Sequence, residues 1–213
     1  MTSTFVTTDR LPFQSLLEQR RTVRALTDGP IQPELLSDLA RAVALTPAAY
    51  NRPPWRVVII HEQRVPFWAA VEDAFRANLD GERLARYLHR LDQFRSGLGA
   101  ILIFEDRSIA SQLLTGHGTP HETASAYIQQ AIGMVQLSLW LALIDHGLGT
   151  SLQHWDWLIE DALPPITGLP VDRFALAAVM PFGYPADTGL GSERRDAPTS
   201  LIAIDSPFAG DDW

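Results

Sequence analysis

Five consecutive residues, Arg20-Arg21-Thr22-Val23-Arg24, concentrate the chemistry that this sequence offers. Three guanidinium groups and one hydroxyl stand together in a chain whose formal net charge is -8. Arginine presents a planar fork of N–H donors that matches phosphate and carboxylate oxygens. The cluster therefore indicates an anion-binding site. The alternative interpretation is a solvated helix end, because the cluster follows a predicted helix over residues 13–19.

A second candidate segment is the turn Pro47-Ala48-Ala49-Tyr50-Asn51, which leads into an apolar strand predicted over residues 56–60. Proline ends a helix, and the side chain of asparagine readily bonds its own backbone in a turn. From the residues alone, Asn51 is therefore a turn former at least as readily as a ligand-binding residue.

A third candidate is Ser151-Leu152-Gln153-His154, which follows the longest apolar helical pattern, residues 123–146. Gly147 is placed to cap that helix, because glycine adopts the left-handed conformation without strain. A lone histidine such as His154, followed by two tryptophans, is more typical of packing or of the surface than of acid catalysis. No catalytic residue is therefore assigned.

Taken in order, these three segments and the later run Met180-Pro181-Phe182-Gly183 resemble the FMN-dependent nitroreductase family. That family has an Arg-Arg-Ser-x-Arg-like element and then Pro-Ser-Ser-x-Asn-x-Gln-Pro-Trp before a strand. The runs Arg24-Ala25-Leu26-Thr27 and Phe94-Arg95-Ser96-Gly97 are most similar to the branch named after a fatty-acid-repression mutant. The resemblance covers residues 13–200, and it rests on the order and spacing of the motifs together.

The resemblance implies one FMN-binding domain over residues 1–213, with its core at 13–200. The implied fold is α+β, with helices flanking a central, mostly antiparallel sheet, in a homodimer whose flavin site is shared between subunits. The implied activity is a ping-pong oxidoreductase: NADPH or NADH reduces FMN at N5, and hydride passes to a nitroaromatic, quinone or similar small molecule. Two alternatives stay open, a flavin- or lipid-responsive regulator and a specialised flavin enzyme such as a reductive dehalogenase.

The resemblance also implies which residues bind the cofactor. Arg20 and Thr22 would meet the ribityl phosphate, Arg24 the pyrimidine edge, and Arg21 either one. A positive group beside flavin N1 and O2 stabilises the reduced, anionic state. The late pair Arg194-Arg195 would reach the phosphate, although composition alone favours a solvated loop there.

Two further elements complete the implied site. The Pro47, Ala48, Ala49 and Asn51 loop would cross from the second subunit and close over the flavin. Ala48-Ala49 replace the family's Ser-Ser, and Arg52-Pro53 replace Ser-Gln, so side-chain hydrogen bonds are lost while backbone contacts remain. Backbone N–H groups of Ser151, Leu152, Gln153 and His154 would lie near flavin N5. Phe94, Arg95 and residues 113–127 would line the acceptor slot.

The composition excludes several other chemistries. The chain has no cysteine, so disulfides, thiolate metal sites and a cysteine nucleophile are excluded. Its acidic charge argues against binding to nucleic acid or to anionic membranes. The histidines lack metal-ligand spacing, since His117 and His121 flank a predicted loop, and no metal is predicted. No signal peptide and no uncharged membrane-spanning run are recognised, and we expect a cytoplasmic protein.

Hydrophobic periodicity predicts helices over residues 33–45, 66–79, 82–94 and 123–146, and buried strands over 56–60, 100–104 and 175–180. Loops are predicted over 117–120 and 187–196. This interleaving fits an α/β or an α+β chain, and the resemblance favours α+β. The helix over 123–146 is apolar on nearly every face, which indicates burial in a monomer or in a dimer. The resemblance favours the dimer, and we expect Val135 or Leu139 to face the partner.

Overall fold

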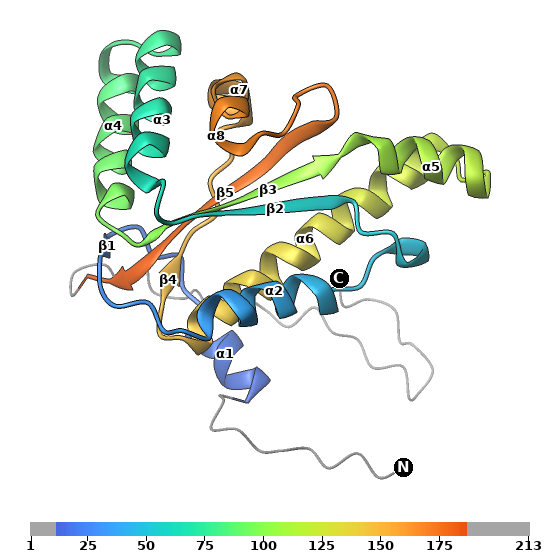
Figure 1. Ribbon diagram of the computed structural model, residues 1–213, viewed down its shortest axis with the longest axis horizontal. Coiled ribbons are helices and arrows are strands. Elements are labelled where there is room, and N and C mark those ends of the chain that lie inside the picture. Colours follow the sequence, from blue (N-terminus) through green and yellow to red (C-terminus); the bar gives the residue numbers. More distant parts are fainter. Residues whose placement is uncertain (1–11, 187–213) are drawn as a thin grey trace, which may run out of the picture.

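The computed structural model describes residues 12–186, whose helices and strands are arranged as in Figure 1. Two predictions lie outside the described residues: the phosphate ligands Arg194 and Arg195, and the loop over residues 187–196. All the other predicted site residues are described.

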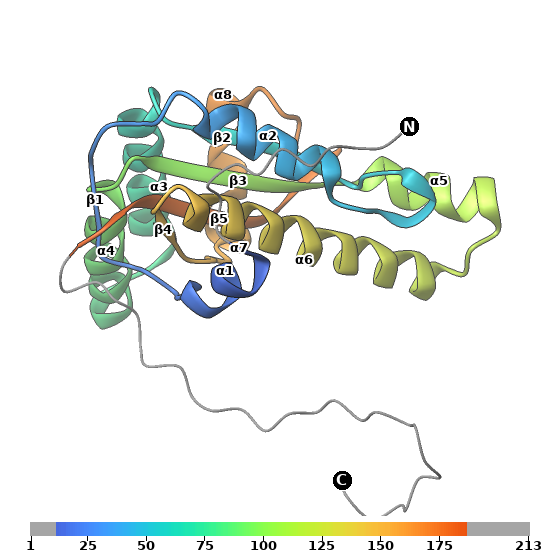
Figure 2. The ribbon, with the colours of Figure 1, turned by 90° about the horizontal axis from the view of Figure 1, so that it is seen from below.

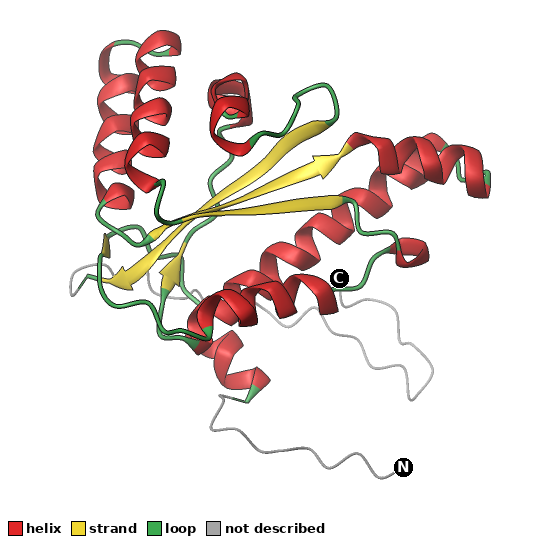
Figure 3. Cartoon of the chain, viewed as in Figure 1, coloured by secondary structure: helices red, strands yellow, loops and turns green. Residues whose placement is uncertain are grey.

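A five-stranded sheet forms the centre of the protein (Figures 1 and 3). Its long strands are β2 (Trp55–Ile60), β3 (Gly99–Asp106) and β5 (Phe174–Pro185). The strand order is β1-β5-β3-β2, with β1 at Leu26–Thr27, and β4 (Gly149–Thr150) also pairs with β5. Every pairing between these strands is antiparallel. The expected α+β fold is therefore confirmed.

Strand β3 separates two hydrophobic cores, because successive side chains of a strand point to opposite faces. Ala100, Leu102 and Phe104 join one core, and Ile101 and Ile103 join the other. All five side chains are at most 2% exposed. The unbroken apolar run thus marks a strand that is covered on both faces.

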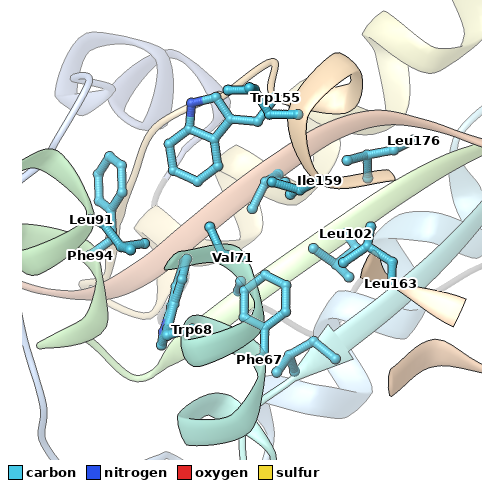
Figure 4. Packing of buried hydrophobic residues seen from close by; sticks show 14 of the residues in the cluster. Phe67, Trp68, Val71, Leu91, Phe94, Leu102, Trp155, Ile159, Leu163 and Leu176 are labelled. Atoms are coloured by element: carbon cyan, nitrogen blue, oxygen red, sulfur yellow. The ribbon is translucent and has the colours of Figure 1, made fainter. Parts of the chain in front are cut away.

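Helices α3 (Arg64–Asn78) and α4 (Gly81–Arg95) cover one face of the sheet, together with the short α7 (Asp156–Ile159). Phe67 and Val71 recur at helical spacing on α3 and are completely buried. Figure 4 shows them packed with side chains from β3, α4 and α7.

Helices α2 (Leu35–Leu45) and α6 (His121–Asp145) cover the other face (Figures 1 and 2). Val135 and Leu139 of α6 are completely buried in the core of their own subunit. The expectation that one of them faces a partner is therefore wrong.

The exposed apolar side chains of α6 lie on another side of the helix. Met134 is 40% exposed and Leu137 is 41% exposed. By length and composition alone, α6 could also cross a membrane. In the structure it packs against α2 and the sheet through nine buried residues, which is the arrangement of a core helix.

Several elements are not predicted by the sequence patterns. The largest is α5 (Arg107–His117), and the shorter ones are η1 (Ala49–Asn51), α7, η2 (Glu160–Ala162), α8 (Pro164–Thr167), β1 and β4. Helix α1 spans Phe13–Gln19 as predicted. Helix α2 begins at Leu35 rather than at residue 33, because Pro33 and Glu34 form a turn before it.

Candidate functional site

Two of the predicted segments lie side by side although most of the chain separates them. Thr22 forms a parallel bridge with Thr150, and the backbone N–H of Val23 donates to the carbonyl oxygen of Thr150 at 2.9 Å. A Cβ on Gly149 would lie 2.8 Å from Cβ of Val23, so the close approach requires glycine. We call this pairing of residues 20–24 with residues 149–154 the arginine end of the molecule.

The three arginines of this end have different surroundings. Nη1 of Arg21 donates to the carbonyl oxygens of Glu18 at 2.6 Å and Arg20 at 2.9 Å, so this guanidinium supports its own backbone. Arg20 is half-buried, and its guanidinium carbon lies 5.0 Å from the ring centroid of Trp140. Among the described residues, the side chain of Arg20 has no hydrogen-bond or ion-pair partner. Arg24 is exposed. Arg20 therefore combines a fixed position with unpaired donors.

The segment from Ser151 to His154 lies against β5, and its side chains alternate between buried and more exposed positions as in a strand. The backbone N–H and C=O of Gln153 both bond Val179 at 2.9 Å. Nε2 of Gln153 donates to Oγ of Ser151 at 3.0 Å, and both side chains are buried. In an antiparallel pair the residues on either side of a hydrogen-bonded residue point their N–H groups away. The N–H groups of Leu152 and His154 have no partner among the described residues, so they are among the donors left for a ligand.

The Pro47–Asn51 loop lies elsewhere, and we call it, with the side chains that hold it, the loop end. The ring of Tyr50 stacks on His117 with centroids 4.1 Å apart and planes 6° apart, and it meets Tyr127 edge-on at 6.5 Å. Nη1 of Arg52 donates to Oε1 of Gln112 at 2.6 Å. The loop is thus fixed against α5 and the beginning of α6.

The backbone of the loop end is strained. Tyr50 and Asn51 have φ angles of 55° and 54°. A bulky residue such as Tyr50 in the left-handed region costs on the order of 1–3 kcal/mol, whereas asparagine adopts this conformation more readily, and such residues cluster at ligand-binding loops. The ring stack compensates part of this cost, so the conformation of Asn51 depends on its neighbours.

The two ends do not meet within one subunit. The arginine end contacts α6 at Trp140, and the loop end contacts it at Tyr127. At about 1.5 Å per residue, these positions are separated by about 20 Å along the helix. Figure 2 shows α1 beneath the carboxyl-terminal half of α6 and the loop near α5. Within the described chain, the two predicted parts of the site are therefore far apart.

The prediction that Phe94 lines the acceptor slot is wrong. Phe94 is completely buried and packs against Trp155, with ring centroids 5.8 Å apart (Figure 4). Arg95 pairs with Glu72 at 2.8 Å and Asp92 at 3.1 Å on the surface. Phe94 does not face a slot, because the helical periodicity of α4 turns it toward the core.

His154 is exposed and lies on the wall of a surface cavity of about 370 Å³. Glu105, Gln136 and residues 175–177 of β5 contribute to the same wall. Within the described part of the chain, no group of three or more histidine or acidic side chains could hold a metal ion. His117, which is close to His121 in sequence, stacks on Tyr50 instead.

Helix α5, which carries His117, is anchored by a buried carboxylate. Oδ1 of Asp106 accepts the backbone N–H of Ser108 at 3.0 Å as the N-cap, and Arg173 forms two bonds to Asp106, at 2.8 and 3.1 Å. The hydrogen bond from Arg173 lowers the pKa of Asp106, and the bonds from Ser108 act in the same direction against the effect of burial.

Two residues in or next to the arginine end are not among the site residues predicted from the sequence. Thr150 is completely buried, and its Oγ1 donates to the carbonyl oxygen of Pro181 at 2.7 Å. Trp140 lies within an apolar helical pattern, which predicts a core residue, and its side chain is buried in the core. Only the packing of α1 against α6 places it beneath Arg20.

The nitroreductase family model matches residues 17–184, and this chain belongs to that family. Two Saccharomyces cerevisiae proteins named as nitroreductases are similar to it. HBN1 is 29% identical over 180 residues, which cover 80% of this chain and 86% of HBN1. FRM2 is 26% identical over 188 residues, which cover 85% and 91%. FRM2 represents the fatty-acid-repression-mutant branch, so the predicted family resemblance is confirmed.

Solved structures of nitroreductases are also similar to this chain. Nitroreductase CinD from Lactococcus lactis, in complex with chloramphenicol, is 28% identical with a TM-score of 0.77, over 90% of this chain and 100% of CinD. A nitroreductase from Desulfovibrio desulfuricans, in complex with FMN, is 24% identical with a TM-score of 0.62, over 93% and 98%. NfnB from Mycobacterium smegmatis, in complex with NADPH, is 19% identical with a TM-score of 0.62, over 83% and 88%. The last two likenesses concern the fold.

Proposed function

We propose that this oxidoreductase binds FMN noncovalently and uses NADPH or NADH to reduce nitroaromatic, quinone or similar acceptors. The observation that carries the proposal is the arginine end. There the fold brings Arg20 to Arg24 beside Ser151 to His154 and leaves donors unpaired. Family membership and the FMN and NADPH complexes of relatives support the same cofactors.

The residues present fit FMN. A dianionic phosphate needs charged or hydroxyl donors, which Arg20 and Thr22 offer, and the exposed Arg24 is available for the pyrimidine edge. The N–H groups of Leu152 and His154 are donors for the polar ring edge. When bound, FMN supplies hydride transfer at N5, and the protein contributes binding, orientation and electrostatics.

The site shares its two halves between subunits in this proposal. The loop end is about 20 Å from the arginine end along α6, so a second copy of the chain would supply the Pro47–Asn51 loop. Met134 and Leu137 are the apolar side chains of α6 that we assign to the dimer contact. Obligate dimers of this kind bury upwards of about 2,000 Å².

No residue of this chain is proposed as a general acid. His154 is exposed, so water reaches the same region and can supply the proton. The acceptor class follows from CinD, which was solved with chloramphenicol and with 4-nitrophenol, both nitroaromatic compounds. One site that serves donor and acceptor in turn predicts ping-pong kinetics. A single domain over residues 1–213 and a cytoplasmic location stay predictions.

The absorption spectrum of the purified protein tests the proposal. We expect a yellow protein that releases FMN on denaturation and oxidises NADPH or NADH with chloramphenicol or 4-nitrophenol as acceptor. A colourless protein that does not take up added FMN would refute the cofactor. Flavin bands without any turnover would favour a flavin-responsive regulator instead.

A further inference from the structure

The position of Arg20 is set by a residue outside the predicted site. Trp140 is 7% exposed and lies in the hydrophobic core between α6 and the sheet. Neighbouring side chains therefore hold its indole ring in place. The guanidinium carbon of Arg20 lies 5.0 Å from the centroid of this ring, within the range of a cation–π contact.

This contact differs from the three other arginine–ring contacts of the described residues. Arg56 lies 5.8 Å from the ring of Phe174, but its side chain is exposed. Arg173 lies 4.9 Å from the ring of Phe174, but its N–H groups are engaged by Asp106. Arg83 lies 4.8 Å from the ring of Trp157, which is 54% exposed on the surface. A half-buried guanidinium over a buried ring, with no described hydrogen-bond partner, is found at Arg20.

A cation–π contact uses the positive charge of a guanidinium and none of its hydrogen bonds, so the N–H donors can still bind a ligand. The contact also removes rotamer freedom before a ligand arrives, and fixing a long side chain in advance increases affinity. In Arg21, by contrast, Nη1 already donates to two backbone carbonyl oxygens, so this nitrogen is not available to a ligand.

We propose that Trp140 is a positioning residue for the cofactor: its indole ring orients the guanidinium of Arg20 toward the phosphate of FMN. This inference rests on the proposed function, because it requires Arg20 to bind FMN. It adds a residue that acts through Arg20 and does not itself touch the cofactor.

Trp68 provides a matched control. Like Trp140, it is a buried tryptophan whose indole N–H has no partner, but it lies in the other core, against Phe67. Replacement of either tryptophan by leucine removes the same atoms and the same unpaired donor. A specific effect of Trp140 on the cofactor is therefore separable from general loss of packing.

The experiment measures FMN affinity by flavin fluorescence and the melting temperature of the FMN-free protein. We expect Trp140→Leu to weaken FMN binding about tenfold, and Trp140→Phe, which keeps an aromatic face, to weaken it by no more than about threefold. Trp68→Leu is expected to lower the melting temperature while FMN affinity stays within about twofold of the parent.

A double variant shows whether Trp140 acts through Arg20. In the Arg20→Ala background, Trp140→Leu should weaken FMN binding no further. The inference is overturned if Trp140→Leu binds FMN as the parent does, if Trp140→Phe is as weak as Trp140→Leu, or if the full effect persists without Arg20. Failure of the parent to bind FMN would instead refute the proposed function, and so would be a distinguishable result.

Discussion

The arginine end and the loop end are built by opposite means. At the arginine end, backbone pairing between Thr22 and Thr150 fixes the geometry, and the guanidinium of Arg20 has no hydrogen-bond partner among residues 12–186. At the loop end, side chains fix the geometry: Tyr50 stacks on His117 while its backbone is held at a φ of 55°. The first end is organised to receive a ligand. The second end exposes the strained residues Tyr50 and Asn51 on the surface, where another molecule could contact them.

The largest effect is expected from a charge on the exposed apolar face of α6. Leu137→Glu should weaken the proposed dimer by more than about a hundredfold, because an unpaired carboxylate would be buried in the interface assigned to Met134 and Leu137. FMN should be lost with the dimer if the two ends combine across subunits. Size-exclusion chromatography with light scattering, together with the flavin content, measures both.

The control for Leu137→Glu is Val65→Glu on α3, where the side chain is 74% exposed. It adds the same charge on the other side of the sheet, and we expect a dimer with full FMN content. A monomeric Leu137→Glu that retains FMN would show that one subunit holds a complete site.

The next effect compares two neighbouring arginines. Arg20→Ala should weaken FMN binding about tenfold to a hundredfold, since a hydrogen bond to a charged group contributes roughly 1.5–3 kcal/mol. Arg21→Ala should weaken it by less than about threefold, because that guanidinium bonds the carbonyl oxygens of Glu18 and Arg20. Equal losses in the two variants, measured by flavin fluorescence, would contradict the distinction.

A smaller effect is expected at the loop end. Tyr50→Ala removes the ring stack on His117, which is worth about 0.5–1.5 kcal/mol, and leaves the strained loop less well fixed. We expect FMN affinity to fall about three- to tenfold and Tyr50→Phe, which keeps the ring, to resemble the parent. An unchanged Tyr50→Ala would mean that the stack does not position the loop.

The smallest effect on FMN is expected at Asp106, which anchors α5 beneath the loop end. Asp106→Asn should lower the free energy of unfolding by about 1–3 kcal/mol at neutral pH, through loss of the charged bonds to Arg173. FMN affinity should change by less than about twofold.

The pH dependence of this effect has a defined sign. The pKa of Asp106 in the folded protein lies below its usual value of 3.8. Its carboxylate therefore stabilises the fold above that value, and the contribution is lost as the pH falls through the lower, folded-state pKa. The difference between parent and Asp106→Asn in urea unfolding should narrow below about pH 4. A constant difference down to pH 3 would show that packing, not charge, is responsible.

The sequence predicts more of the arginine end than of the loop end, for physical reasons. An arginine cluster is a local pattern, so residues 20–24 are recognised from composition, whereas residues 151–154 are identified through the family resemblance, after a glycine-capped helix. The fold class follows from apolar runs such as residues 100–104. Which N–H groups stay free does not follow, because it depends on the register of Gln153 against Val179.

The loop end depends on contacts between distant segments. The stack of Tyr50 on His117 requires α5, a helix whose pattern is too weak to predict, and the left-handed Tyr50 has no local signature. Phe94 and Val135 show the same limit from the other direction. Helical spacing places them on an apolar face of their helix. Only the tertiary packing shows that each side chain faces the core of its own chain.

The central claim, that the arginine end of one subunit joins the loop end of another around FMN, is tested by a mixed dimer. One chain carries Arg20→Ala, the other carries Tyr50→Ala with Asn51→Ala, and the heterodimer is isolated with two affinity tags. In a shared arrangement one site combines an intact Arg20 with an intact loop, while the other site has both defects. We predict one tightly bound FMN per heterodimer. Each of the two variant homodimers, Arg20→Ala alone or Tyr50→Ala with Asn51→Ala alone, should bind FMN weakly. A heterodimer that binds FMN no better than the two homodimers would contradict the shared site.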